Sequence, residues 1–148
     1  NSVVLPLDFE PGGRDLTGNV ISDRNWLFGH SWQYMAQDKP LIFLDNYEGN
    51  TGYFPLVWRD AVNPYHHLCV NGAMEGQPPH ATIGLYEQRT GVGVYYVLLW
   101  CYHDKWRSDQ QFDQLYSELN TRYYQVYASP GGRTLLYARN NRDIQQSR

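Results

Sequence analysis

The chain has 148 residues, of which 42% are hydrophobic, 16% aromatic and 18% charged. This length suits one domain that needs no metal or disulfide for stability, and so aromatic a composition excludes intrinsic disorder. The net charge of −3 gives no general attraction to nucleic acid, so no nucleic-acid partner is expected. The longest apolar run, from Val92 to Tyr102, is too short for a membrane-spanning helix.

The first third of the chain alternates between strand and helix signals. Ser2 to Phe9 is an apolar run before a Pro-Gly-Gly break, which predicts a buried strand. Apolar residues recur at helical spacing over Asp23 to Lys39, and Pro40 ends that helix. The continuous apolar run from Leu41 to Leu44 predicts a second strand that is covered on both faces.

The middle of the chain is less regular. Tyr53 to Trp58 is either an edge strand or an extended loop, because it contains Pro55. A helix is expected from Pro79 to Arg89, with Gly91 just beyond its end. Val92 to Cys101 predicts a strand that is apolar on both faces.

The last third predicts one helix and two strands. Ser108 is the expected cap of the helix, with Gln111 completing a capping box. Gln125 to Ala128 and Leu135 to Ala138 then form strands joined by a turn that contains Gly131.

This order of elements predicts an α/β fold. We expect a three-layer, Rossmann-like, mostly parallel sheet with an antiparallel C-terminal hairpin at one edge. Residues 1–140 would form this single domain, and residues 141–148 would be a frayed polar tail.

Polar residues that follow the predicted strands are the candidates for a binding or catalytic rim, because ligands of open α/β sheets bind at the carboxyl ends of strands. Carboxylates and an imidazole there would suit a divalent cation or general acid–base chemistry. Asp and Asn also commonly cap turns after strands, and that interpretation is favoured. The candidates are Asp8, Asp45, Asn46, Tyr47, Glu48, His103 and Asp104.

Other chemistry-bearing residues give weaker signals. His30 lies on the apolar stripe of the first predicted helix, where a hydrogen-bonded core histidine is the favoured interpretation. Buried free thiols are preferred for Cys69 and Cys101, ahead of a disulfide and then of metal ligation. No paired zinc-ligand spacing and no phosphate or dinucleotide motif is complete, so neither a metal site nor a cofactor is expected.

The aromatic residues admit two interpretations. The chain has five tryptophans and thirteen tyrosines, and core and interface packing is their default role. The alternative is a surface on which the flat rings stack against the apolar faces of sugars.

Four stretches carry a resemblance to a known family: VVLPLDF, FGHSWQYMAQDKPLIFLDNYEGNTGYFPLVW, NPYHHL and YEQRTGVGVYYVLLW. Together they resemble the soluble C-terminal tail domain of bacterial multi-pass membrane glycosyltransferase-like proteins of the dolichyl-phosphate-mannose transferase type. The resemblance implies a place on the extracytoplasmic face of a membrane, with the membrane-embedded part of the same parent protein as partner. It also implies that catalytic residues lie in that membrane part. His30, the residues from Asp45 to Glu48 and those from Tyr53 to Pro55 would then shape a rim that holds an acceptor or docks on the membrane part.

Three functional hypotheses follow. The first is a non-catalytic accessory domain that contacts a saccharide acceptor, and a chain that begins with Asn suits a fragment of such a parent. The second is a small α/β hydrolase or transferase that uses Asp8, Asp45, Glu48 and His103. The third is a protein–protein interaction module whose aromatic face packs on another chain.

Overall fold

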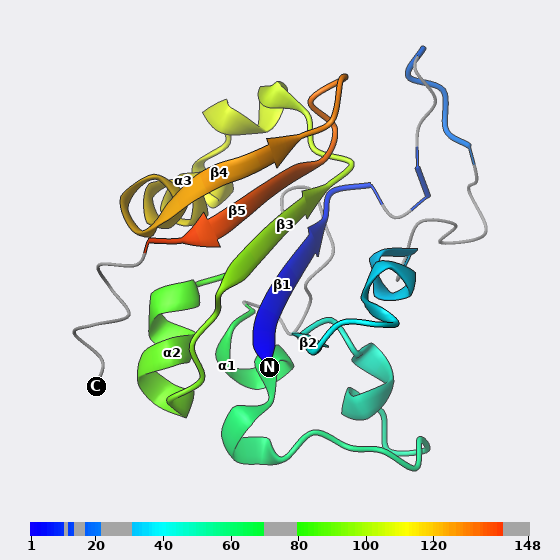
Figure 1. Cartoon of the computed structure of the whole chain (residues 1–148), viewed down its shortest axis with the longest axis vertical. Helices are drawn as coiled ribbons and strands as arrows, with labels where there is room; N and C mark the ends of the chain where they lie inside the picture. The colour runs from blue at the N-terminus through cyan, green and yellow to red at the C-terminus, as the bar shows by residue number, and fades with distance from the viewer. Residues whose placement is uncertain (11, 14–16, 22–30, 70–79, 141–148) are drawn as a thin grey trace.

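The computed structural model describes residues 1–10, 12–13, 17–21, 31–69 and 80–140 (Figure 1). They form an α/β fold with one open, mixed sheet of five strands in the order β2-β1-β3-β5-β4. β1 is parallel to β2 and β3, whereas β5 is antiparallel to β3 and β4. The α/β class predicted from the sequence is therefore confirmed. The strands are β1 Ser2–Asp8, β2 Leu41–Phe43, β3 Tyr96–Trp100, β4 Tyr123–Ala128 and β5 Leu135–Arg139.

Three α-helices and several short 3₁₀ helices connect the described strands. None of the described helices is long and apolar enough to cross a membrane. The α-helices are α1 Pro64–His67, α2 Ile83–Thr90 and α3 Gln110–Arg122, and the 3₁₀ helices that matter below are η1 Ser31–Ala36, η2 Tyr47–Asn50, η3 Asp60–Val62 and η5 Asp104–Ser108.

The helix boundaries differ from expectation in places. The helix predicted over 23–39 contains η1, and residues 22–30 lie outside the described part of the chain. α2 begins at Ile83 and ends before Gly91, whose φ of 69° supplies the left-handed cap that glycine adopts without strain. α3 is capped by Asp109, whose side chain accepts a hydrogen bond from the Gln111 amide at 2.9 Å. The prediction of Ser108 as the cap was wrong, because Ser108 belongs to η5 and its hydroxyl donates to the Lys105 carbonyl.

The second strand is less covered than its apolar sequence indicates. Ile42, in the middle of β2, is 40% exposed, so the prediction of a strand buried on both faces was wrong. β2 has three residues and stands at the edge of the sheet, where β1 is its partner. A strand in that position has a neighbouring strand on one side, and this leaves its middle residue accessible to water.

The main core fills the space between one face of the sheet and the three α-helices. Because side chains alternate along a strand, one set of residues from β1, β3 and β5 points to this core. Figure 1 shows α1 and α3 behind the sheet. Phe9, at the end of β1, packs edge-on against Tyr102 and Phe112, with ring centroids 5.4 and 5.6 Å apart. The core includes Val3, Leu5, Leu7, Val97, Leu99, Leu135 and Tyr137 from the sheet region, and Tyr65, Leu68, Ile83, Tyr86, Leu115 and Leu119 from the helices.

A network of four charged side chains, Glu87, Glu118, Arg122 and Arg139, fastens the helices to the sheet. Glu87 Oε1 accepts hydrogen bonds from the Val94 amide at 2.7 Å and from Arg139 Nη1 at 2.9 Å, and Arg122 Nη2 donates to Glu87 Oε2. Glu118 Oε2 accepts from the Gly84 amide at 2.7 Å, near the start of α2. The network therefore joins α2, α3 and β5, and it connects them to the segment that leads into β3.

We predict that Glu87→Gln lowers the free energy of unfolding by about 3 kcal/mol, because it leaves Arg139 without its carboxylate partner and Arg122 with Glu118 alone, in a mostly buried site. Glu87 and Arg139 are each only 12% exposed in their side chains. Urea denaturation followed by circular dichroism measures the change. Asp104→Asn is the matched control, because Asp104 pairs with Arg107 at 3.4 Å while 81% exposed, and its loss should cost less than about 0.5 kcal/mol. Equal losses in the two variants would contradict this role of the network.

Glu118 generates a prediction about pH. Burial raises the pKa of Glu118 above its ordinary value, and this outweighs the Gly84 amide and Arg122, which lower the pKa. The folded state therefore binds this proton more tightly than the unfolded state, so protonation stabilises the fold at low pH and the benefit is lost as the pH rises through the folded pKa. Glu118→Gln imitates the protonated form. We expect the variant to be at least as stable as the wild type at pH 7. As the pH falls toward 5, the free energy of unfolding of the wild type should rise relative to that of the variant. A stability difference that moves the other way in denaturation curves at several pH values would refute this.

Candidate functional site

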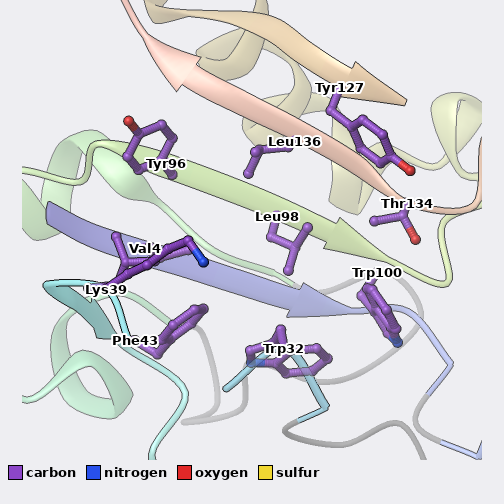
Figure 2. A pocket seen from close by; sticks show the side chains of 11 residues that line it. Val4, Trp32, Lys39, Phe43, Tyr96, Leu98, Trp100, Tyr127, Thr134 and Leu136 are labelled. Atoms are coloured by element: carbon purple, nitrogen blue, oxygen red, sulfur yellow. The ribbon is translucent and has the colours of Figure 1, made fainter. Parts of the chain in front are cut away.

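The second face of the sheet carries an aromatic cleft of about 710 Å³ (Figure 2). Its floor is formed by Val4, Leu98 and Leu136, which lie on three adjacent strands. These residues alternate with the core residues of the same strands, so they point away from the three α-helices. Five aromatic side chains, two polar residues and one further aliphatic residue complete the lining: Trp32, Phe43, Tyr96, Trp100 and Tyr127, then Lys39 and Thr134, then Leu41.

Figure 2 shows how the walls of the aromatic cleft are arranged. Phe43 and Trp32 lie on the side of β2, and Tyr127 lies on the side of β4 and β5. Trp32, from η1, meets Trp100 edge-on with ring centroids 5.8 Å apart. The cleft is thus bounded by segments from both ends of the chain.

Asp45 holds one wall of the cleft in place. Trp32 Nε1 donates a hydrogen bond of 2.8 Å to Asp45 Oδ2, and both residues are 3% exposed. A charged acceptor makes this bond stronger than a bond between neutral groups. Asp45 follows β2, as the sequence indicates, and its observed contact positions the tryptophan of the cleft wall.

Asp8 lies at the end of β1, opposite Trp100 in the register of the sheet. It is 2% exposed, and its Oδ1 accepts a hydrogen bond of 3.0 Å from the Glu10 amide. This contact turns the chain after β1, which is the capping role that the sequence interpretation favours for such residues. Asp8 is not among the described residues that line the aromatic cleft.

The residues after Asp45 act mainly through their backbone. The Asn46 carbonyl accepts a bond of 2.8 Å from Trp58 Nε1, and the Glu48 carbonyl accepts from the Thr51 hydroxyl at 2.7 Å. Gly49 is required here, since a Cβ would lie 2.9 Å from Trp58 Cδ1. The side chain of Tyr47 and all of His30 lie outside the described part of the structure.

His103 and Asp104 lie on the turn after β3. His103 Nδ1 accepts a bond of 3.1 Å from the Lys105 amide and so caps η5. Asp104 forms the exposed ion pair with Arg107 described above. Both residues therefore have local structural partners.

A second hollow of about 300 Å³, the edge crevice, lies at the carboxyl ends of β1 and β3. The strand order changes direction at this pair, which is where open α/β sheets commonly bind ligands. Of the predicted rim residues, His103 borders the edge crevice, together with Glu10, Cys101, Lys105 and Arg133, whereas Asp8 and Asp45 are not among its described lining. Across the described residues no three His, Cys, Asp or Glu side chains are grouped so that they could hold a metal ion.

Cys69 and Cys101 are not joined to each other by a disulfide, and both are partly buried. Cys101 has a φ of 54°, a backbone conformation that is unusual for a residue with a Cβ. The pKa of the Cys101 thiol is raised to about 12, mainly by burial. The nearby negative charges of Asp8 and Glu10 also raise the pKa, whereas the positive charge of Arg133 lowers it. The thiol is therefore neutral at physiological pH, which disfavours a nucleophilic role.

Most of the cleft escaped prediction from the sequence. The interpretation of the five tryptophans as a sugar-stacking surface includes Trp32 and Trp100, which line the cleft, and Trp58 and Trp106, which pack against the core. The fifth, Trp26, lies outside the described residues. Tyr96, Tyr127 and Phe43 were not singled out. The signal that could have identified them is the alternation of side chains along each strand. Once one face of the sheet is known to hold the helices, this alternation assigns every second residue to the other face.

We predict that Cys101 reacts with iodoacetamide at pH 8 at least about tenfold more slowly than an ordinary thiol does, because its raised pKa lowers the thiolate fraction by more than the higher nucleophilicity of the thiolate restores. The measurement uses the Cys69→Ser variant, so that a single thiol remains, and follows alkylation by mass spectrometry. The same variant in denaturing urea is the control and should react at the ordinary rate. Equal rates in folded and unfolded protein would show that the thiol is not protected.

Comparison with known proteins supplies no relative from which a function could be transferred. No protein-family model, no curated protein and no solved structure matches the chain. The geometry of the aromatic cleft and of the edge crevice therefore carries the evidence for the function of this chain.

Proposed function

We propose that the chain is a non-catalytic binding domain that holds a saccharide in the aromatic cleft. The observation that carries this proposal is the cleft itself, about 710 Å³ in volume and lined by five aromatic side chains. Small-molecule sites in proteins have volumes of roughly 300–1,000 Å³ and combine apolar walls with a few polar groups. The size and lining of the cleft match that description.

The kind of lining favours a sugar over a purely apolar molecule. Tryptophan and tyrosine rings offer flat apolar faces for the C–H faces of a pyranose, while tyrosine also presents a hydroxyl. Thr134, Lys39 and the tyrosines Tyr96 and Tyr127 add donors and acceptors around an apolar floor. The flat apolar surface would contact the C–H face of a sugar ring, and the scattered polar groups would form hydrogen bonds with its hydroxyl groups.

The described lining of the cleft offers few groups suited to turnover. Its described lining includes no carboxyl, imidazole or thiol group. A general acid or base must lie within hydrogen-bond reach of the reacting atom. Among the predicted candidates, Asp45 is engaged by Trp32 beneath the wall and His103 caps η5. Binding without chemistry is the function that this arrangement supports best.

The setting of the domain is part of the same proposal. The resemblance in sequence implies a membrane glycosyltransferase-like parent, with this domain on the extracytoplasmic face beside the membrane-embedded part of that protein. The saccharide would then be the acceptor, presented to catalytic residues elsewhere in the parent. A C-terminal hairpin formed by β4 and β5 also belongs to this proposal, and the antiparallel pairing of these two strands supports it.

The edge crevice supports a second candidate, a small hydrolase or transferase. Glu10, His103 and Arg133 border one hollow at the point where the strand order reverses. A carboxylate, an imidazole and a guanidinium suit acid–base work on an anionic substrate. Turnover of a glycoside or phosphoester that is lost in His103→Ala would favour this candidate over the binding domain.

A neighbouring pair of tyrosines tests the proposed site. Tyr96 lines the aromatic cleft, whereas Tyr95 is 36% exposed and is not among the described lining residues. We predict that Tyr96→Ala weakens saccharide binding by about 1 kcal/mol, or roughly fivefold, because one stacking ring is lost, and that Tyr95→Ala leaves affinity unchanged.

The experiment titrates the 148-residue chain with neutral and acidic oligosaccharides and follows tryptophan fluorescence, since Trp32 and Trp100 lie in the cleft. Thermal unfolding of each variant checks that the fold is retained. The proposal fails if no oligosaccharide changes the fluorescence at millimolar concentration, or if both tyrosine variants lose binding equally.

A further inference from the structure

We propose that the edge crevice, together with a hollow beside it, binds the phosphate group of a small organic phosphate through Arg133, His103 and Lys105. The second space, the turn hollow, has a volume of about 360 Å³ and lies against the turn between β4 and β5. His103 and Arg133 border both spaces, so their side chains face both. This phosphate site shares no described lining residue with the aromatic cleft, and it requires no turnover.

Arg133 carries a positive charge that no carboxylate of the described chain neutralises. Three of the described arginines are half-buried, namely Arg122, Arg133 and Arg139. Arg122 and Arg139 form ion pairs with Glu87, whereas the side chain of Arg133 forms neither an ion pair nor a hydrogen bond with any described residue. A guanidinium that is partly removed from water is stabilised by a group of opposite charge. The donors of Arg133 are therefore available to an anion in the crevice.

Hydrogen bonds in the turn between β4 and β5 hold the backbone of Arg133 in place. The Arg133 carbonyl accepts from the Tyr102 amide at 2.8 Å, which ties the turn to the chain just after β3. The Ser129 amide donates to the Thr134 carbonyl at 2.9 Å, and the Ser129 hydroxyl accepts from the Thr134 amide at 3.0 Å. A binding residue whose backbone is already ordered loses less entropy when the ligand arrives.

Two further side chains supply donors at the edge crevice. His103 Nδ1 accepts the hydrogen bond from the Lys105 amide, so the neutral ring carries its proton on Nε2 and donates from there. Lys105 adds an ammonium group, whose Nζ lies 4.5 Å from the centroid of the Trp106 ring. Donors from three separate side chains suit the three terminal oxygens of a phosphate monoester better than the two oxygens of a carboxylate.

The acidic groups nearby do not cancel the positive charge. The Asp104 carboxylate borders the turn hollow, but it belongs to the exposed ion pair with Arg107 described above. The Cys101 thiol is neutral, and Glu10 supplies the one carboxylate on the described lining of the edge crevice. The two cationic side chains of that lining outnumber it. Charge complementarity therefore favours an anionic ligand.

The space on the two sides of Arg133 indicates that the phosphate carries an organic group. The edge crevice of about 300 Å³ and the turn hollow of about 360 Å³ are each large enough for a small molecule. A phosphate ion alone would fill only part of either space. The site also lies at the carboxyl ends of β1 and β3, where the strand order changes direction and ligands of open α/β sheets commonly bind.

Isothermal titration calorimetry of the 148-residue chain with glycerol 3-phosphate, inorganic phosphate and glycerol tests the proposal. We expect glycerol 3-phosphate to bind with a Kd below about 1 mM, inorganic phosphate to bind more weakly, and glycerol to give no heat of binding at the same concentrations. Arg133→Gln should weaken glycerol 3-phosphate binding at least about tenfold, because the charged donors are lost. Arg133→Lys keeps the charge without the planar donor group, so it should lose less affinity than Arg133→Gln.

Arg89→Gln is the matched control, because it removes the same charge from an exposed position on α2 that borders neither hollow. It should change the affinity by less than about twofold. Tyr96→Ala should also leave phosphate binding unchanged, because Tyr96 lines the aromatic cleft, so this result does not depend on saccharide binding. Circular dichroism should show that all variants are folded.

Three results would overturn the proposal. The first is a wild-type chain that gives no heat of binding with glycerol 3-phosphate up to about 10 mM. The second is an equal loss of affinity in Arg133→Gln and Arg89→Gln, which would show that general charge attraction is responsible. The third is tighter binding of inorganic phosphate or of glycerol than of glycerol 3-phosphate.

Discussion

A buried carboxylate must be surrounded by donors, and in this protein Glu87 meets that requirement by binding three separate parts of the chain. The Val94 amide, Arg122 and Arg139 all donate to it, so α2 and α3 are held to β5 and to the segment that leads into β3. Tyr123 adds to this connection by donating from its hydroxyl to the Val94 carbonyl at 2.9 Å. An unpaired charge in a poorly hydrated site costs free energy. A shift of either helix would separate one of these charged groups from its partner and would therefore be unfavourable.

The aromatic cleft lies on the face of the sheet opposite to the helices. With the α-helices gathered over the face that carries Val97 and Leu99, the face that carries Leu98 and Trp100 is bounded among the described elements mainly by η1 and the sheet edges. The Trp32–Asp45 hydrogen bond then sets the position of the wall. Asp45 illustrates how a carboxylate at the end of a strand contributes to a site without touching its ligand, through the orientation of an aromatic ring.

Local patterns predicted the elements well where the local sequence determines them. The apolar run at the N-terminus became β1, the run before Cys101 contains β3, and the periodic segment after Asp109 became α3. Prediction failed where the outcome depends on position in the sheet. The run from Leu41 to Leu44 has the composition of a central strand, but β2 is an edge strand, and neighbours in space are not encoded in four residues.

The candidate site was harder to predict than the fold for the same reason. The cleft is formed by residues as far apart as Val4 and Leu136, which become neighbours through β3. The carboxylates that follow strands were visible in the sequence, but burial and local hydrogen bonds decided their roles. Asp8 turns the chain, as the favoured interpretation of a strand-end Asp expects, whereas the role of Asp45 in orienting a tryptophan cannot be inferred from its residue type.

The alternation of side chains along β1 and β3 has a consequence for how this protein can change over generations. Residues that face the helices stabilise the fold. Their immediate neighbours in sequence face the cleft, where a ligand would contact them. A substitution at Tyr96 or Leu98 therefore alters the surface that meets a ligand while leaving Val97 and Leu99 in the core. One strand can accumulate new specificities at every second position without losing the stability that the other positions maintain.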